Sequence, residues 1–109
     1  MIIRIWCGWV SREDAGAYAD YMRRVALPGY TRVAGNRGLY MLRRRDEGLE
    51  EFCMVTVWDS LEAIKEFAGP NYEEAVFYPR DDEYLVDREW TVRHYDIYGR
   101  ANLDPADPA

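Results

Sequence analysis

The sequence predicts an α+β protein with a ferredoxin-like βαββαβ fold built on an antiparallel sheet. Segments with strand and helix patterns follow one another in the order β-α-β-β-α-β, which is the order of that fold. The tetrapeptide DEGL at 46–49 contains a glycine that accepts a positive φ, and it is typical of a hairpin turn. The length of 109 residues corresponds to one domain. We expect that domain at residues 1–98 and a mobile tail without periodic pattern at 99–109.

The first half is expected to contain a strand followed by a helix. Residues 2–8 combine β-branched and aromatic side chains, which favour a strand. Ser11 opens the sequence SRED, which resembles a capping box and predicts the start of a helix. Apolar residues then recur every three or four positions, as on one face of a helix. Pro28 and Gly29 predict that this helix ends near Leu27.

The second half is expected to contain a hairpin, a helix and a last strand. Asp59 or Ser60 is the expected cap of the helix, and Gly69 followed by Pro70 ends it. The expected segments are strands over 39–45, 50–58 and 88–98, a short second helix over 72–77 and a polar connection over 80–87.

The composition narrows the classes of partner. The formal net charge of −6 argues against binding to nucleic acid, which requires a basic surface. No apolar run approaches the roughly 18 residues of a membrane span, and the chain begins with a strand pattern instead of a signal peptide. We therefore expect a cytoplasmic protein, in which Cys7 and Cys53 are free, buried thiols. No metal site is expected, because there is one histidine and the acidic run at 81–83 is interpreted as a solvated loop.

The alternation of side chains predicts a homodimer. A two-residue turn at Glu47 and Gly48 fixes the pairing of the hairpin strands, and an assumed register with Cys7 opposite Cys53 adds the first strand. One face of the sheet then carries Ile2, Arg4, Trp6, Leu39, Met41, Phe52, Met54 and Trp58. The other face carries Ile3, Ile5, Cys7, Tyr40, Leu42, Cys53, Val55 and Val57. Both faces are apolar, the helices cover only one of them, and the pattern leaves open which.

The block VTVWDSLEAIKEFAG, which begins at Val55, and the last-strand sequence RHYDIY resemble the antibiotic biosynthesis monooxygenase superfamily. The likeness extends over most of residues 2–98. It implies a dimeric α/β barrel with a ligand site between the sheet and the helices. Known members imply two kinds of chemistry, which are cofactor-independent oxygenation of quinol-like aromatic substrates and oxidative breakdown of haem.

The haem-degrading members use an asparagine, a tryptophan and a histidine. The resemblance aligns these three positions with Trp6, Phe67 and Phe77, so none of them matches. The resemblance therefore favours the cofactor-independent chemistry over haem breakdown, and haem remains the second expectation.

His94 and Arg4 are the candidate catalytic residues. His94 is the only histidine, and a histidine near neutral pH can accept a proton from a phenol. Arg4 lies in an apolar strand, where its guanidinium needs an acceptor such as a substrate oxygen. The structural alternatives are a packed or edge-of-sheet histidine and an ion pair of Arg4 across the sheet or the dimer, for example with Asp96 or Glu89. The candidate substrate-binding residues, which can also be ordinary core, are Trp6, Trp58, Phe67, Tyr72, Phe77 and Tyr78.

The sequence thus predicts a monooxygenase-like enzyme without metal or flavin, acting on an aromatic, quinol- or polyketide-type molecule. Two alternatives stay open. One is a dimeric module that binds a small hydrophobic ligand without catalysis, and the other is a cyclase or isomerase on the same scaffold.

Overall fold

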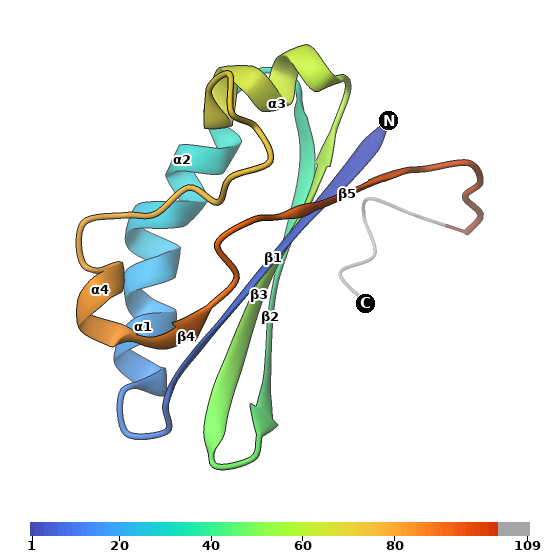
Figure 1. Cartoon of the computed structure of the whole chain (residues 1–109). Helices are drawn as coiled ribbons and strands as arrows, with labels where there is room; N and C mark the ends of the chain where they lie inside the picture. Colours follow the sequence, from blue (N-terminus) through green and yellow to red (C-terminus); the bar gives the residue numbers. More distant parts are fainter. Residues whose placement is uncertain (103–109) are drawn as a thin grey trace.

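A computed structural model describes residues 1–102 and shows one antiparallel sheet with the helices on one of its faces (Figure 1). The elements in chain order are β1 (Ile2–Ser11), α1 (Ala15–Tyr21), the π-helical η1 (Met22–Ala26), α2 (Leu27–Thr31), β2 (Asn36–Asp46), β3 (Leu49–Trp58), α3 (Leu61–Ala68), α4 (Asp81–Tyr84), β4 (Leu85–Arg88) and β5 (Arg93–Asp96). The predicted α+β, ferredoxin-like fold is confirmed. No helix in this part of the chain is long and apolar enough to cross a membrane.

The sheet has the strand order β2-β3-β1-β4, and β5 also pairs with β1. Residues 8–10 of β1 pair with β4, and residues 2–5 pair with β5. The single last strand predicted over 88–98 is therefore wrong, because two short strands share one edge of β1. The predicted polar connection over 80–87 is also wrong, since it holds α4 and most of β4.

The segment 70–79, which we call the strap, connects α3 to α4 on the helix side of the sheet (Figure 1). Its predicted helix over 72–77 is absent. Instead, the amide of Ala75 donates to the carbonyl of Trp90, and the amide of Val92 donates to the carbonyl of Glu73, both at 2.9 Å. These long-range bonds take backbone groups that a helix would need, and they draw residues 90–92 away from β1.

The predicted registers are confirmed. Cys7 lies opposite Cys53 and Asp46 lies opposite Leu49. Glu47 and Gly48 have φ angles of 47° and 87°, so both residues of the hairpin turn are left-handed, as a two-residue turn of this kind requires. Because side chains alternate with a period of two, this one turn determines the face of every residue in β2 and β3.

The face that carries Arg4 is the face that meets the helices. Its buried side chains include Arg4, Trp6, Phe52, Met54, Thr56 and Trp58, and they pack against Tyr18, Met22, Tyr30 and Ile64 from the helices. The opposite face, which we call the open face, is not covered by any described helix (Figure 1). The alternation of side chains in the sequence did not determine which face packs against the helices, and the structure shows that it is the face of Arg4.

The first helix differs from its prediction at both ends. Ser11 still belongs to β1, and the helix begins at Ala15. The helix also does not end at Leu27, because it passes through the π-helical η1 into α2, which has Pro28 in its first turn. A proline is tolerated there, since its missing amide would have no helical partner in a first turn.

The second helix, α3, begins as predicted at one of the two candidate caps. Ser60 accepts a hydrogen bond from the amide of Ala63 at 3.2 Å. Asp59 is used differently, because its two carboxylate oxygens accept from Arg37 at 2.6 and 2.7 Å. The helix ends before Gly69, whose φ of 86° suits a glycine.

The prediction of free thiols is wrong, because Cys7 and Cys53 form a disulfide. They are directly opposed on neighbouring strands with their Cα atoms 4.2 Å apart, so the confirmed register itself brings the sulfur atoms together.

The end of the chain adds no further element to the described part. Residues 99–102 carry no helix or strand, and the rest of the predicted mobile tail, 103–109, lies outside the described residues.

Candidate functional site

Arg4 is the centre of the site, and its guanidinium is buried with only 2% of the residue exposed. Nη1 donates to the carbonyl of Tyr72 at 2.5 Å and Nη2 donates to the carbonyl of Glu74 at 3.0 Å. Nη1 also lies 3.1 Å from Nε2 of His94, which is directly opposite on β5. Arg4 therefore ties β1 to β5 and to the strap.

Within the described chain, Arg4 does not form the ion pair across the sheet that was its structural alternative. Glu89 accepts instead from Arg93 at 3.0 Å and from the amide of Cys7 at 2.7 Å. Among residues 1–102, no carboxylate, that of Asp96 included, forms an ion pair with Arg4. Burial lowers the pKa of Arg4, as expected for a charge that carbonyls and an imidazole satisfy without a counter-ion.

The contact with Arg4 determines the protonation of His94. A guanidinium only donates, so Nε2 of His94 accepts, and a neutral ring then carries its proton on Nδ1. Burial, and after it the positive charge of Arg4, lower the pKa of His94 below 6.5. The imidazole is therefore neutral at neutral pH.

Two phenols on the helix side lie near enough to Arg4 for its charge to act on them. Tyr30 in α2 is buried, and burial raises its pKa. Burial also raises the pKa of Tyr78 to about 12. The positive charge of Arg4 acts on both phenols in the opposite direction. Both hydroxyls therefore keep their protons at neutral pH and remain able to donate.

Aromatic rings pack on the guanidinium of Arg4 and on its neighbours. The ring of Phe67 lies 5.6 Å below it, stacks on Tyr30 at 4.4 Å and contacts Trp58 at 5.4 Å. The ring of Tyr72 meets His94 edge-on at 5.6 Å. The structure thus brings together Arg4, His94, Trp58, Phe67, Tyr72 and Tyr78 from the predicted set.

The other two predicted residues lie in a neighbouring cluster. Trp6 and Phe77 meet edge-on at 6.1 Å, and Phe77 meets the exposed Trp90 at 5.3 Å. The indole nitrogen of Trp6 donates to the carbonyl of Glu89 at 2.7 Å. The guanidinium of Arg88 covers both Phe77 and Trp90 at 4.7 Å.

Two residues of the site were missed by the sequence analysis. Tyr30 lies beyond the predicted end of the first helix, although it continues the four-residue spacing of Tyr18, Met22 and Ala26. Asp81 was assigned to a solvated loop, but it is buried and accepts from the hydroxyl of Tyr18 at 3.1 Å and the amide of Tyr78 at 2.7 Å. Burial raises its pKa.

Two hollows of the described surface lie away from Arg4. One of about 50 Å³ lies between α1, η1 and the hairpin strands, and a more open one of about 270 Å³ lies at the hairpin end. Neither is lined by a predicted site residue. Phe67 lies against Arg4, and Trp58 and Tyr30 pack on Phe67. The strap also covers the guanidinium through the carbonyls of Tyr72 and Glu74, so a ligand enters there only when these groups move.

The sequence matches no family model and no curated protein. The fold, in contrast, matches solved structures over nearly their whole length. An antibiotic biosynthesis monooxygenase from Bacillus cereus, described as putative in its name, matches with a TM-score of 0.63 and 15% identity, over 95% of this chain and 97% of that one. This chain has the fold of the antibiotic biosynthesis monooxygenases.

Two structures of the haem degrader MhuD also match. A mutant with two manganese protoporphyrin IX molecules bound per active site has a TM-score of 0.60 and 16% identity, over 93% of this chain and 98% of that one. The protein from Mycobacterium tuberculosis, with two haems in its active site, has a TM-score of 0.54 and 19% identity, over 93% and 99%. At these identities the likeness shows a shared fold.

The residues of this site do not fit a haem in the arrangement described. The lone pair on Nε2 of His94 accepts from Arg4, and the other ring nitrogen carries the proton, so no imidazole nitrogen is free to bind iron. The ring of Phe67, on which Trp58 packs, also occupies the space beside Arg4.

Proposed function

We propose that the chain is a monooxygenase-type enzyme that acts on an aromatic, quinol- or polyketide-type molecule without a metal or flavin cofactor. The observation that carries the proposal is the buried guanidinium of Arg4, which has no carboxylate partner among residues 1–102 and lies beside a neutral imidazole. A fixed positive charge in a site of low dielectric stabilises an oxygen anion that forms next to it.

In this proposal His94 is the base and Arg4 stabilises the anion. A substrate hydroxyl that replaces His94 as the acceptor for Arg4 frees Nε2 to take the hydroxyl proton. The lowered pKa of His94 keeps the base form populated at neutral pH. The electron-rich anion then reacts with O2. One oxygen atom enters the substrate as a carbonyl in place of two hydrogens, and the other leaves with those hydrogens as water.

The aromatic residues hold the substrate in the proposed reaction. Phe67, Trp58 and Tyr72 present flat apolar surfaces to a planar ring and exclude water from the anion. The protonated hydroxyl of Tyr78 is a donor for a second substrate oxygen. Trp6 and Phe77 would contact the part of a larger substrate that extends toward Trp90.

The test is oxygen consumption with a panel of quinols and anthrone-type compounds, followed by mass spectrometry of the products. His94→Gln should remove the base and lower kcat by about 100-fold or more, in the range for a general base. Arg4→Lys keeps the charge but loses the forked donors, and a smaller loss is expected. Full activity of the His94→Gln variant on an identified substrate would refute the role of His94.

The same experiment separates the two alternatives. A cyclase or isomerase would convert a substrate without consuming oxygen. A non-catalytic module would bind a ligand and leave it unchanged. The packing around Arg4 does not favour either alternative over oxygenation, because a ligand can reach Arg4 in all three cases only after the strap opens.

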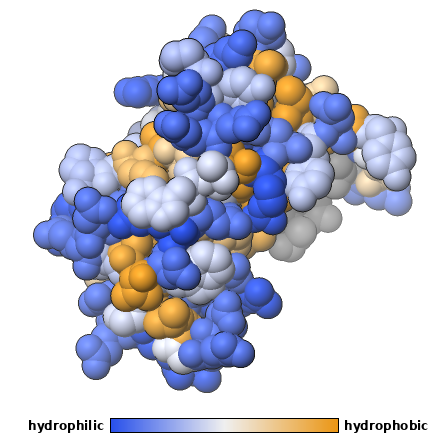
Figure 2. Space-filling model, in the orientation of Figure 1, coloured by the Kyte–Doolittle hydropathy of each residue, from blue (hydrophilic) through white to orange (hydrophobic). Residues whose placement is uncertain are grey.

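We also propose that the protein is a homodimer whose interface is the open face of the sheet. Three of the seven exposed large hydrophobic side chains in the described chain, Tyr40, Leu42 and Tyr95, lie on this face. Ile3, Ile5, Val55 and Val57 lie between them. In the orientation of Figure 1, which views the sheet nearly edge-on, hydrophobic side chains reach the surface in scattered groups between hydrophilic ones (Figure 2).

The dimer is tested by sedimentation at micromolar concentration. The unchanged chain should sediment as a dimer, and Leu42→Glu, which places a charge on the open face, should produce a folded monomer. Glu62→Lys is the control, since Glu62 is exposed on α3 and should leave the dimer intact. A monomer for the unchanged chain would refute the proposal.

A further inference from the structure

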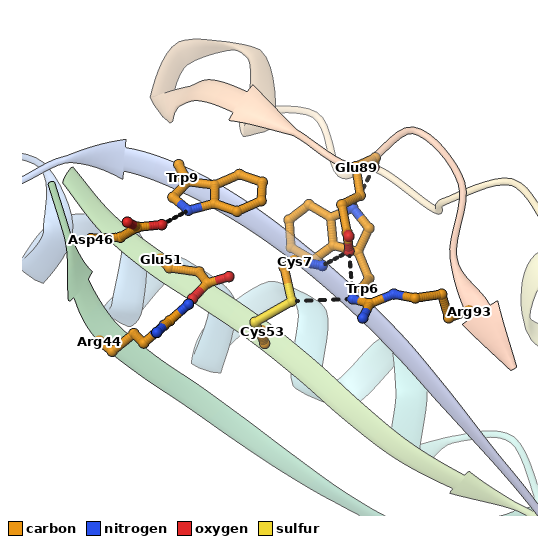
Figure 3. The surroundings of a disulfide bond; sticks show 9 residues. All are labelled: Trp6, Cys7, Trp9, Arg44, Asp46, Glu51, Cys53, Glu89 and Arg93. Carbon is orange, nitrogen blue, oxygen red and sulfur yellow. Dashed lines mark hydrogen bonds and ion pairs between the residues drawn. A yellow bond between two sulfur atoms is a disulfide. The ribbon is translucent and has the colours of Figure 1, made fainter. Parts of the chain in front are cut away.

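The open face carries a second group of chemically active side chains, remote from the layer of Arg4. Cys7, Cys53 and Glu51 lie together where β1 pairs with β3, and Figure 3 shows the carboxylate of Glu51 beside the sulfur atoms. One ligand atom from each of the three residues lies within 4.8 Å of the others. Within residues 1–102 no other set of histidine, cysteine and carboxylate side chains is gathered in this way.

The backbone holds the two cysteines together whether or not the disulfide is present. Cys7 and Cys53 are one pair in an unbroken register of ten pairs between β1 and β3, from Ile2 with Trp58 to Ser11 with Leu49. Both strands have a further neighbour on their other side. Reduction of the disulfide therefore leaves two thiols facing each other on adjacent strands, and a chelating pair is already in place.

Two arginines lie beside the groups that would carry negative charge in the reduced site. Nη2 of Arg93 lies 3.7 Å from the sulfur of Cys7, where a positive charge favours a thiolate. Arg44 forms an ion pair with the carboxylate of Glu51 and fixes its orientation (Figure 3). Two thiolates and the carboxylate of Glu51 carry three negative charges. A divalent cation offsets two of them and Arg44 pairs with Glu51, whereas Arg93 is shared with the carboxylate of Glu89.

We propose that Cys7, Cys53 and Glu51 form a redox-gated site for a thiophilic divalent cation such as Zn²⁺. In the disulfide state the sulfurs are bonded to each other and the site is closed. A dithiol reductant opens it by thiol–disulfide exchange: two electrons and two protons pass to the cysteine pair, and the reductant becomes a disulfide. Binding of the cation then releases the two thiol protons to solvent.

The donor set selects the kind of metal. Thiolates favour zinc and similar soft ions, and they disfavour magnesium and calcium, which prefer oxygen ligands. Two sulfurs and one carboxylate oxygen are three protein ligands, and water completes the tetrahedron, as in zinc sites with an open position. Such a site differs from a closed structural site, which needs four protein ligands. No metal site of either kind was predicted from the sequence.

Arg44 and Arg93 do not bind the cation themselves. They contact the residues that bind it, Glu51 and Cys7. A hydrogen-bonded partner holds a metal-binding carboxylate in place, and loss of such a partner weakens metal affinity by about 10- to 100-fold. Replacement of Glu51 itself should cost at least as much. This inference goes beyond the proposed oxygenation and does not depend on it, because the site faces away from the helices. The site does lie on the face proposed as the dimer interface, so in the dimer the cation would lie between the two sheets.

The test is a calorimetric titration with Zn²⁺ alone, before and after reduction by a phosphine that is not itself a thiol. The reduced chain should bind one Zn²⁺ per chain, and the oxidised chain should bind at least about 100-fold more weakly. Co²⁺ in place of Zn²⁺ should give a thiolate-to-metal absorption band in the reduced chain only, which identifies sulfur as a ligand.

Glu51→Gln should weaken Zn²⁺ binding to the reduced chain by about tenfold or more. Glu50→Gln is the matched control, because Glu50 is the neighbouring carboxylate on β3, pairs with Arg43 at 2.9 Å and belongs to the other face. Both variants keep the disulfide, so their folding is checked in the oxidised state. Equal Zn²⁺ affinity of the oxidised and reduced chains would overturn the proposal, and so would equal affinity of the two variants.

Discussion

The disulfide between Cys7 and Cys53 should supply a large part of the stability of this small domain. The two residues are 46 positions apart, and the loop they close contains the first helix and the whole of β2. In the chain-entropy model, a cross-link around a loop of this length removes about 13.5 cal/mol/K from the unfolded state, which is about 4 kcal/mol at 25 °C. Native domains are stable by only about 5–15 kcal/mol in total.

The perturbation is reduction of the disulfide, and the assay is thermal unfolding followed by circular dichroism. For a domain of about 100 residues, 1 kcal/mol corresponds to about 4–8 °C in Tm, so reduction should lower Tm by roughly 15–30 °C. In urea, the slope m should rise as well, because the reduced chain exposes more surface when it unfolds. The double variant Cys7→Ala with Cys53→Ala is the control, and its Tm should not respond to the reductant.

Two results would refute this reasoning. If the oxidised and reduced chains melt within about 2 °C of each other, the cross-link does not restrict the unfolded chain. If Tm falls as expected but m is unchanged, the effect lies in the folded state instead, and the loop-entropy account is wrong.

Two further predictions concern packing and titration. Gly35→Ala should lower the free energy of unfolding in urea by about 1–3 kcal/mol, because an added Cβ would lie 2.3 Å from the Cβ of Ala63. Gly38→Ala is the control, since a Cβ there meets open space, and it should lower the free energy of unfolding by less than about 1 kcal/mol. Equal losses in the two variants would contradict the close approach of Gly35 to Ala63. His94 has a folded pKa below the unfolded value of 6.5, so its contribution to stability is present above pH 6.5 and is lost as pH falls through the folded pKa. His94→Gln should flatten stability in that interval, and an unchanged pH profile would show that the ring is not buried as described.

The sheet was predictable because its pattern is repetitive and local. One glycine-containing turn set the register of β2 and β3, and the alternation of side chains then assigned every residue to a face. The register of β1 followed from placing Cys7 opposite Cys53. The same step could have suggested the disulfide, but composition alone favoured free thiols.

The elements that were predicted wrongly all depend on contacts between residues distant in sequence. Local pattern favoured a helix over 72–77, but the carbonyls of Tyr72 and Glu74 are bound by Arg4, which is about seventy positions earlier in the chain. Likewise, the first helix was ended too early because Pro28 is a strong local signal, whereas packing of Tyr30 against Phe67 keeps the chain helical beyond it. Local propensity is outweighed where a buried residue recruits the backbone.

The sequence allowed the residues of the candidate site to be predicted, but not their contacts with one another. His94 and Arg4 were chosen because a lone histidine and a strand arginine need partners, yet their pairing with each other depends on the short strand β5. The predicted partners were carboxylates. The structure uses two carbonyls and an imidazole instead, and this choice leaves the positive charge of Arg4 uncompensated.

That uncompensated charge restricts which ligands can open the strap. A ligand oxygen that displaces both His94 and the carbonyl of Tyr72 from Nη1 of Arg4 leaves a backbone acceptor without its partner, at a cost of about 1–3 kcal/mol if it stays buried. A neutral ligand oxygen only exchanges one neutral acceptor for another and does not recover this cost. An anionic oxygen makes a charge-assisted hydrogen bond about twice as strong. The strap should therefore favour ligands that are acidic or that lose a proton on binding, and His94, neutral and 3.1 Å from Arg4, is placed to take that proton.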